Sequence, residues 1–213
     1  MNTSQFIDQL HAIKIDCVFN PYSERCSIFD LKNAPKIRSE ALRKVLEKAD
    51  AAKLDSLWIG RDLGYRGGRR TGLAFTDDRH LKTHDNRWGV ELRRSTHGDE
   101  VAERSATVLW QALSRVHTSV FLWNVFPFHP FVAERPLSNR SHNAVERNIG
   151  TELLVELIDL LQPRKLLPIG KEATHIALKV SGKRQVLPVR HPSYGGQREF
   201  LEQVSKHTGT DHD

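Results

Sequence analysis

Three polar side chains that can take part in catalysis or ligand binding each lie at the end of a short apolar run. Asp62 follows Leu-Trp-Ile-Gly-Arg, Asn124 ends Val-Phe-Leu-Trp-Asn, and His191 follows Val-Leu-Pro-Val-Arg. A carboxylate can orient water or stabilise a developing cation, and an amide offers a donor and an acceptor to a flat heterocycle. An imidazole can donate a hydrogen bond to a leaving oxygen. Each residue is also a common structural cap or loop tie, so the functional interpretation requires that the three meet.

Asp62 lies in a loop, residues 60–72, that holds five glycines and four arginines. Glycine lets the backbone approach a ligand closely and arginine suits phosphate, so this loop is a candidate ligand site. Phe75 closes the loop and can stack on a planar ligand. The alternative is a flexible basic surface loop, in which the following residues are solvated charges: Arg66, Arg69 and Arg70.

A second candidate loop follows His191. Its sequence, Pro-Ser-Tyr-Gly-Gly, offers a serine hydroxyl and backbone amides, which are small donors suited to phosphate. Tyr194 can wedge into a stack of bases. Together an acid, an aromatic ring, an edge-reading amide and a histidine suit the binding of a flat base and the departure of an anion from a sugar.

Apolar periodicity predicts the elements that position these side chains. Helical spacing predicts helices at residues 4–13, 35–52, 99–116, 143–161, 171–180 and 197–206. Apolar runs predict strands at residues 57–60, 120–125, 165–169 and 185–189. This alternation indicates an α/β fold, a three-layer α/β/α sandwich with a central parallel sheet. Because the carboxyl ends of parallel strands share one edge, we expect the residues that follow the strands to converge: Asp62, Asn124, Gly170 and His191.

The other segments carry weaker patterns. Ser4 and Asp99 are predicted helix N-caps, and residues 16–33 are predicted to form an ordered loop. Residues 76–98 are dense in His, Arg and Asp, which predicts a solvated insertion. The tail from His207 on is polar and expected to fray.

Composition limits the class of protein. The chain has 213 residues, 38% of them hydrophobic and 27% charged, which predicts a single domain over 1–213 with an N-terminal helical segment at about 1–52. No apolar run could span a membrane and no secretion signal is recognisable, so a cytoplasmic location is expected. Cys17 and Cys26 are too few for a disulfide framework or a four-thiolate metal site. The net charge of +6 is compatible with a polyanionic partner.

Four motifs carry a resemblance to a known family. Residues 60–65, Gly-Arg-Asp-Leu-Gly-Tyr, are similar to the Gly-Gln-Asp-Pro-Tyr-His and Gly-x-Asn-Pro-Gly motifs of the uracil-DNA glycosylase superfamily. Residues 71–75, Thr-Gly-Leu-Ala-Phe, resemble its Thr-Gly-x-Pro-Phe segment. Residues 121–124 resemble the apolar run that ends in the uracil-reading Asn, and residues 190–193 resemble its His-Pro-Ser motif. The order and spacing agree over about residues 57–200.

The resemblance implies a four-stranded parallel sheet between helices, and hydrolysis of the N-glycosidic bond of deoxyuridine in DNA after base flipping. Asp62 would position water and favour an oxocarbenium-like sugar, and His191 would stabilise charge on the uracil carbonyl. Phe75 would stack on the flipped base and Asn124 would pair with its edge. The other implied uracil-binding residues are Gly60, Arg61 and Tyr65. The implied DNA contacts are Arg66, Arg69, Arg70, Arg140, His142, Ser193, Tyr194, Gly195, Gln197 and Arg198.

This chain departs from the family pattern in three places. The iron–sulfur branches use four cysteines, so we expect no cluster, metal or other cofactor in a chain with two. The family tyrosine that excludes the methyl group of thymine is replaced by Gly64, and Tyr65 stands one place later. His142 lies where one branch carries a histidine that traps the abasic sugar covalently, and we interpret it as a DNA-facing or solvated residue.

The sequence therefore predicts a monofunctional, metal-independent uracil-DNA glycosylase of base-excision repair, monomeric and acting on single- or double-stranded DNA. Three alternatives stay open. The chain could be a module that binds or covalently traps uracil-DNA without turnover. It could be a glycosylase for mismatched or other deaminated bases. It could also be a small-molecule, nucleotide-binding α/β enzyme, whose binding would depend little on salt.

Overall fold

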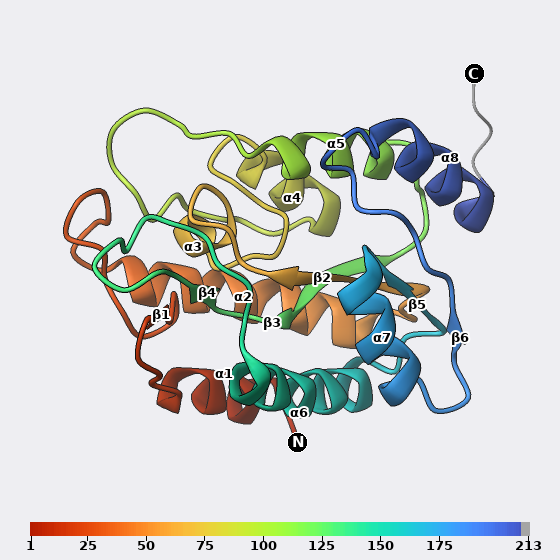
Figure 1. The fold of residues 1–213 in the computed structure, drawn as a ribbon, viewed down its shortest axis with the longest axis horizontal. Coiled ribbons are helices and arrows are strands. Elements are labelled where there is room, and N and C mark those ends of the chain that lie inside the picture. Colours follow the sequence, from red (N-terminus) through yellow and green to blue (C-terminus); the bar gives the residue numbers. More distant parts are fainter. Residues whose placement is uncertain (210–213) are drawn as a thin grey trace.

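A sheet of four parallel strands organises the protein. The computed structural model describes residues 1–209. In this sheet the strand order is β3–β2–β5–β6, and every neighbouring pair is parallel, as Figure 1 shows. The strands are β2 Ser56–Asp62, β3 Val120–Phe126, β5 Lys165–Pro168 and β6 Gln185–Val186. The predicted α/β fold with a four-stranded parallel sheet is confirmed, although β6 is shorter than its apolar run.

Helices cover both faces of the sheet. One face packs against α1 Thr3–Ala12, α2 Ala34–Ala51, α6 Ala144–Leu161 and α7 Lys171–Val180. The other packs against α5 Arg104–Leu113 and α8 Gln197–Thr208. Because side chains alternate across a strand, Leu57 and Ile59 enter the first core and Trp58 enters the second. All three are fully buried, so β2 is the centre of both cores.

The parallel register brings the predicted chemistry to one edge. Gly60 of β2 pairs with Asn124 of β3, and Asp62 pairs with Phe126. Ile169, just beyond β5, forms an isolated parallel bridge with Val189, two residues before His191. The carboxyl ends of all four strands therefore lead into neighbouring loops.

The predicted helices occur, with corrected ends. The N-cap of α1 is Asn2 and not Ser4, because the Asn2 side chain accepts from the Gln5 N–H while the Gln5 side chain accepts from the Asn2 N–H. Asn143 caps α6 in the same way. The last helix extends to Thr208, so residues 207 and 208 belong to α8, and the rest of the tail beyond 209 lies outside the described residues.

The prediction that residues 76–98 form a solvated insertion is wrong. This segment contains the helix α4 Leu81–Trp88, and Asp77, Asp78 and His84 within it are buried. The reason is pairing: buried carboxylates here accept from backbone amides and from arginine, which offsets their desolvation.

Those carboxylates also shorten the next helix. A helix was expected from Asp99, but α5 begins at Arg104. The Val101 N–H donates to Asp78 Oδ2 at 3.3 Å and the Glu103 N–H donates to Asp77 Oδ2 at 2.6 Å. Side-chain acceptors thus hold residues 99–103 in a non-helical path.

The segment 16–33, expected to be an ordered loop, contributes a short strand. β1 Val18–Phe19 pairs antiparallel with β4 His129–Pro130. The remaining short helix, α3 Gly68–Thr71, lies within the glycine-rich loop. Within residues 1–209 the structure contains no helix of the length and apolarity that a membrane crossing requires.

Acid should weaken this fold through buried His84. Burial, aided by Arg87, lowers the pKa of His84 to about 3. Below about pH 6.5 this histidine therefore takes up a proton in the unfolded chain but stays neutral in the folded protein. From pH 7 to pH 5 this linkage removes about 2 kcal/mol of unfolding free energy. We expect His84→Gln to lessen that loss by about the same amount, measured by denaturant unfolding at both pH values.

His117→Gln, the same exchange at an exposed position, is the control for the substitution itself. Equal pH dependence in the wild type and in His84→Gln would contradict the assignment.

Candidate active site

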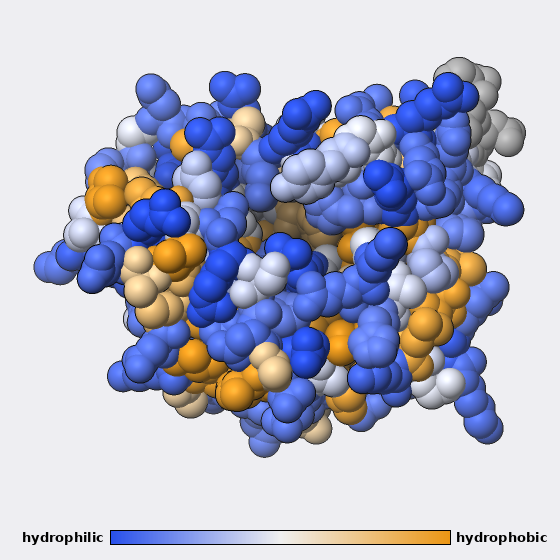
Figure 2. Space-filling view, viewed as in Figure 1, coloured by the Kyte–Doolittle hydropathy of each residue, from blue (hydrophilic) through white to orange (hydrophobic). Residues whose placement is uncertain are grey.

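A cavity of about 770 Å³ opens at the carboxyl edge of the sheet. Figure 2 shows the surface hollowed near the middle of this face, within a mostly hydrophilic rim. Eight of the predicted site residues line it: Arg61, Asp62, Phe75, Asn124, Arg140, His191, Ser193 and Tyr194. The expected convergence of the strand ends therefore occurs, and Gly170 also lines the cavity.

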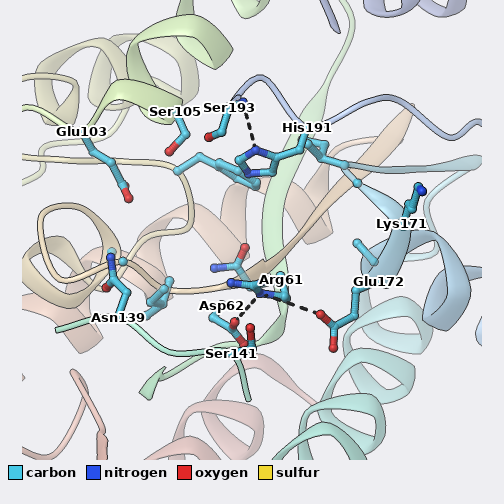
Figure 3. A pocket seen from close by; sticks show the side chains of 18 of the residues that line it. Arg61, Asp62, Glu103, Ser105, Asn139, Ser141, Lys171, Glu172, His191 and Ser193 are labelled. Atoms are coloured by element: carbon cyan, nitrogen blue, oxygen red, sulfur yellow. Dashed lines mark hydrogen bonds and ion pairs between the residues drawn. The ribbon is translucent and has the colours of Figure 1, made fainter. Parts of the chain in front are cut away.

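The Asp62 carboxylate is held at both oxygens. Arg61 Nε donates to Oδ2 at 2.7 Å, and His142 Nδ1 is hydrogen-bonded to Oδ1. The other ring nitrogen of His142, Nε2, lies 2.9 Å from Glu172 Oε1, a close ionic contact without hydrogen-bond geometry. Figure 3 shows Glu172 near Arg61, whose Nε is 3.9 Å from Glu172 Oε2. A carboxylate fixed in this way is preorganised to face a developing positive charge.

The interpretation of His142 as a DNA-facing or solvated residue is wrong. Its side chain is fully buried, with its ring in edge contact with Phe126. A carboxylate can only accept a hydrogen bond, so the proton of this pair lies on Nδ1. His142 is therefore a partner of Asp62, placed by the loop before α6.

Asn124 presents an unused amide to the cavity. The residue is buried, yet among residues 1–209 no group is hydrogen-bonded to its side chain. Gly60 makes this position possible, because a Cβ there would collide with Asn124 Oδ1 and with the Phe75 ring. A buried amide without a protein partner is suited to hydrogen-bond a ligand.

Phe75 is held in a strained conformation beside this amide. Its φ of 52° lies in the left-handed region, which is rare for a bulky residue. Trp110 Nε1 donates to the Phe75 carbonyl at 2.9 Å and so fixes the backbone. Strain of this kind clusters at functional sites, where it aims a side chain.

His191 is a neutral donor. The Ser193 N–H donates to His191 Nδ1 at 3.2 Å, so Nδ1 carries no proton and Nε2 does. Burial lowers the pKa of His191, and the charge of Arg61 lowers it further. At neutral pH the imidazole therefore offers an Nε2–H to the cavity that it lines, where Figure 3 shows it beside Ser193.

The loop after His191 projects an aromatic ring into solvent. Tyr194 is fully exposed with φ at 54°, and Gly195 follows with φ at 77°. Ser193 and Tyr194 line the cavity, whereas Gly195, Gln197 and Arg198 do not. Gln197 and Arg198 begin α8, and Arg198 Nε donates to Glu202 Oε1 at 2.7 Å.

Three arginines predicted to contact DNA have guanidinium groups that bind to other residues of the protein. Arg69 is buried over the Phe19 ring, and its Nη1 is hydrogen-bonded to His129 Nδ1 at 2.8 Å. Arg70 is buried and donates to Asp78 Oδ2 at 2.6 Å. The predicted DNA contacts of Arg69 and Arg70 are therefore corrected to structural roles, because desolvated guanidinium groups need such partners.

Arg140 is the third. Although it borders the cavity, all its guanidinium nitrogens donate to protein acceptors, among them both oxygens of Glu146. Arg66, by contrast, is exposed, and its Nε donates to the Tyr65 hydroxyl at 3.0 Å. Tyr65 does not line the cavity, so its predicted contact with a base is not supported by the geometry.

Two acidic lining residues escaped the sequence analysis. Glu172 lies two residues beyond Gly170, so its position just after the predicted strand 165–169 was a signal in the sequence. Glu103 lies in the segment predicted to be helical and had no recognisable signal. The other polar lining residues that were not predicted are Ser105, Asn139, Ser141 and Lys171.

Glu103 occupies the space beside Gly64. A Cβ at Gly64 or at Gly67 would collide with its carboxyl oxygens. Burial raises the pKa of Glu103 to about 7, with a further upward contribution from Asp77 and an opposing one from Arg66.

As for metals, residues 1–209 contain no cluster of three or more His, Cys, Asp or Glu side chains placed to bind an ion.

The fold and this site define a class. The sequence model of the uracil DNA glycosylase superfamily matches residues 47–207, so the chain belongs to that superfamily. Its glycosylases are hydrolases of N-glycosyl bonds that act on DNA in base-excision repair.

A solved structure gives the same picture of the fold. The crystal structure of wild-type SMUG2 from Pedobacter heparinus is similar to this chain, with a TM-score of 0.67 over 97% of each chain at 14% sequence identity. At this identity the likeness concerns the fold alone. No curated protein sequence matches the chain.

The two kinds of arginine in the glycine-rich loop should separate in stability. Arg70→Ala leaves the fully buried Asp78 carboxylate without its closest cation, so we expect a loss of about 3–5 kcal/mol in unfolding free energy. The matched change Arg66→Ala, at an exposed position of the same loop, should alter it by less than about 0.5 kcal/mol. Denaturant unfolding of both variants measures this, and similar losses would contradict the assignment.

Proposed function

We propose that this chain is a DNA glycosylase that removes uracil from DNA by hydrolysis and leaves an abasic site. The observation that carries the proposal is the unpartnered Asn124 amide, next to a fixed Asp62 carboxylate and a neutral His191 in one cavity. In this proposal residues 1–213 act as a monomeric, single-domain enzyme of the cytoplasm, on single- or double-stranded DNA.

Recognition begins with a base outside the helix. The uracil ring stacks on Phe75, and Asn124 offers its N–H and C=O to the edge that carries N3 and O4. Gly60 supports this arrangement, since any side chain there would displace both the ring and the amide. Extrusion of the base from the stack is required because its reacting bond is inaccessible within a duplex.

Bond cleavage uses charges that develop in the transition state. As the glycosidic bond breaks, the sugar gains positive charge and the base becomes an anion. Asp62, oriented by Arg61 and His142, stabilises the sugar and orients water, and the His191 Nε2–H donates to the uracil oxygen next to the bond. Fixed groups of this kind act mainly on the transition state and so accelerate the reaction.

The DNA strand is held by the loop after His191. Ser193, which lines the cavity, contacts a phosphate beside the flipped nucleotide in this proposal, and the exposed ring of Tyr194 fills the gap that the base leaves. The exposed Arg66 supplies a further phosphate contact. The surroundings of His142 favour turnover over covalent trapping, because both ring nitrogens face carboxylates.

Excision of uracil tests the proposal. The purified protein, incubated with a uracil-containing oligonucleotide, should generate alkali-labile abasic sites. Asp62→Asn and His191→Ala should each lower the single-turnover rate by about 100-fold or more, since each removes a charge or donor from the transition state. Asp159→Asn, an exposed carboxylate on α6, is the matched control and should act within about twofold of the wild type.

No product from single- or double-stranded substrate would refute the function. A protein–DNA band that survives denaturing electrophoresis, and that His142→Ala abolishes, would favour the trapping module instead.

The orientation of Asp62 by His142 has its own kinetic signature. His142→Ala removes the donor to Oδ1, so we expect kcat to fall about 10- to 100-fold with KM changed by less than about threefold. Glu172→Gln keeps a side-chain oxygen of the same reach beside His142 Nε2 and should lose less activity than Glu172→Ala. His175→Ala, at an exposed position of α7, is the control. Equal rates in the two Glu172 variants would contradict a positioning role.

A further inference from the structure

The Glu103 carboxyl forms one wall of the cavity. It lines the cavity together with Gly64, and it occupies the volume that a side chain at Gly64 or Gly67 would need. Figure 3 shows Glu103 across the cavity from Lys171 and Glu172, with its carboxyl directed inward. The two glycines therefore leave room for an acidic side chain from a distant part of the sequence.

The position of Glu103 is fixed from behind. Its backbone N–H donates to Asp77 Oδ2 at 2.6 Å, and the other oxygen of Asp77 accepts from the His80 N–H at 2.9 Å and lies 2.7 Å from His80 Nδ1. Among residues 1–209, however, no donor is hydrogen-bonded to the Glu103 carboxyl. A polar group held in a cavity without a protein partner is available to a ligand.

The edge of the base that meets this wall follows by elimination, and this step rests on the proposed function. Asp62 faces the sugar, His191 faces the oxygen beside the glycosidic bond, and Asn124 faces the edge with N3 and O4. The edge that remains carries C5 and C6. We propose that Glu103 is a specificity-determining residue that contacts the C5 edge of the flipped base, favours hydrogen or a hydroxyl group there, and disfavours a methyl group.

The selectivity follows from solvation. With hydrogen at C5 the carboxyl stays in contact with cavity water, and a C5 hydroxyl can hydrogen-bond to it directly. A C5 methyl displaces that water and provides no hydrogen bond, which leaves a polar group buried and unsatisfied. Gly64 has no side chain that could exclude a C5 methyl group sterically. At this wall the methyl group is instead disfavoured by the polarity of the Glu103 carboxyl.

The charge of Glu103 should make this selectivity depend on pH. The titratable groups around the carboxyl are Asp77, with His80 behind it, and Arg66. Burial and Asp77 raise the pKa of Glu103 to about 7 against the effect of Arg66, so the carboxylate forms as the pH rises through neutrality. The charged form resists desolvation more than the acid, and discrimination against a methyl group should increase with pH.

The test compares three bases in one DNA sequence. Single-turnover excision is measured for uracil, thymine and 5-hydroxyuracil, whose methyl and hydroxyl groups are close in size. Glu103→Leu keeps the bulk and removes the polarity. We expect it to raise thymine excision relative to uracil by about 10-fold and to lower 5-hydroxyuracil relative to uracil by a similar factor.

Two further variants complete the design. Glu103→Gln is nearly isosteric and does not titrate, so the preference for uracil over thymine, which should grow several-fold from pH 6 to pH 8 in the wild type, should be constant in this variant. It also carries the test if Glu103→Leu does not fold. Glu100→Gln, an exposed residue of the same segment, should match the wild type in every ratio.

The outcomes separate this inference from the proposed function. If the wild type excises uracil but Glu103→Leu changes neither the thymine-to-uracil nor the 5-hydroxyuracil-to-uracil ratio, the role of Glu103 is overturned and the function stands. The same holds if both ratios move in the same direction, because a change in cavity volume alone would have that effect. A pH-independent preference in the wild type also overturns it. If the folded wild type excises none of the three bases, the proposed function fails, and the inference that rests on it fails too.

Discussion

The Asp62 carboxylate ties together the parts of the protein that make the site. It extends from the end of β2, is bound by His142 from the loop before α6, and reaches Glu172 on α7 through that imidazole. Each contact comes from a different segment of the chain. A charge buried to this degree must be paired, so the three segments are held in one arrangement. The preorganisation needed at the carboxyl edge thus depends on one anion and its partners.

Buried ion pairs give the surrounding loops the same rigidity. Arg38 and Asp30, both fully buried, are 2.9 Å apart, and Arg70 pairs with Asp78 beneath the glycine-rich loop. The segment 76–98 supplies Asp77 and Asp78, whose carboxylates also hold the backbone before α5. Glycines in this loop therefore serve close approach rather than flexibility. The loop packs against its neighbours, and Glu103 fills the space beside its glycines at the cavity.

The strands and the residues that follow them could be predicted because each strand is a contiguous apolar run of the sequence. A parallel strand is a short apolar run, and its carboxyl end faces the same edge as its neighbours'. Asp62, Asn124 and His191 follow such runs directly, so their meeting needed no knowledge of the loops. The DNA contacts predicted for Arg69 and Arg70 were wrong for the opposite reason. Arg66, Arg69 and Arg70 look alike in the sequence, and only their partners make one exposed and two buried.

The sequence by itself determined the fold class, the superfamily and the residues at the strand ends, since each depends on periodicity or on a contiguous motif. Only the tertiary structure decided the partners of those residues. His142 reaches Asp62 from 80 positions away, and Glu172 lies against the other ring nitrogen of that histidine. Glu103 fills the space beside Gly64 because distant carboxylates keep its backbone out of a helix. Pairing across such separations depends on which buried charges can be satisfied together, and no local pattern records that.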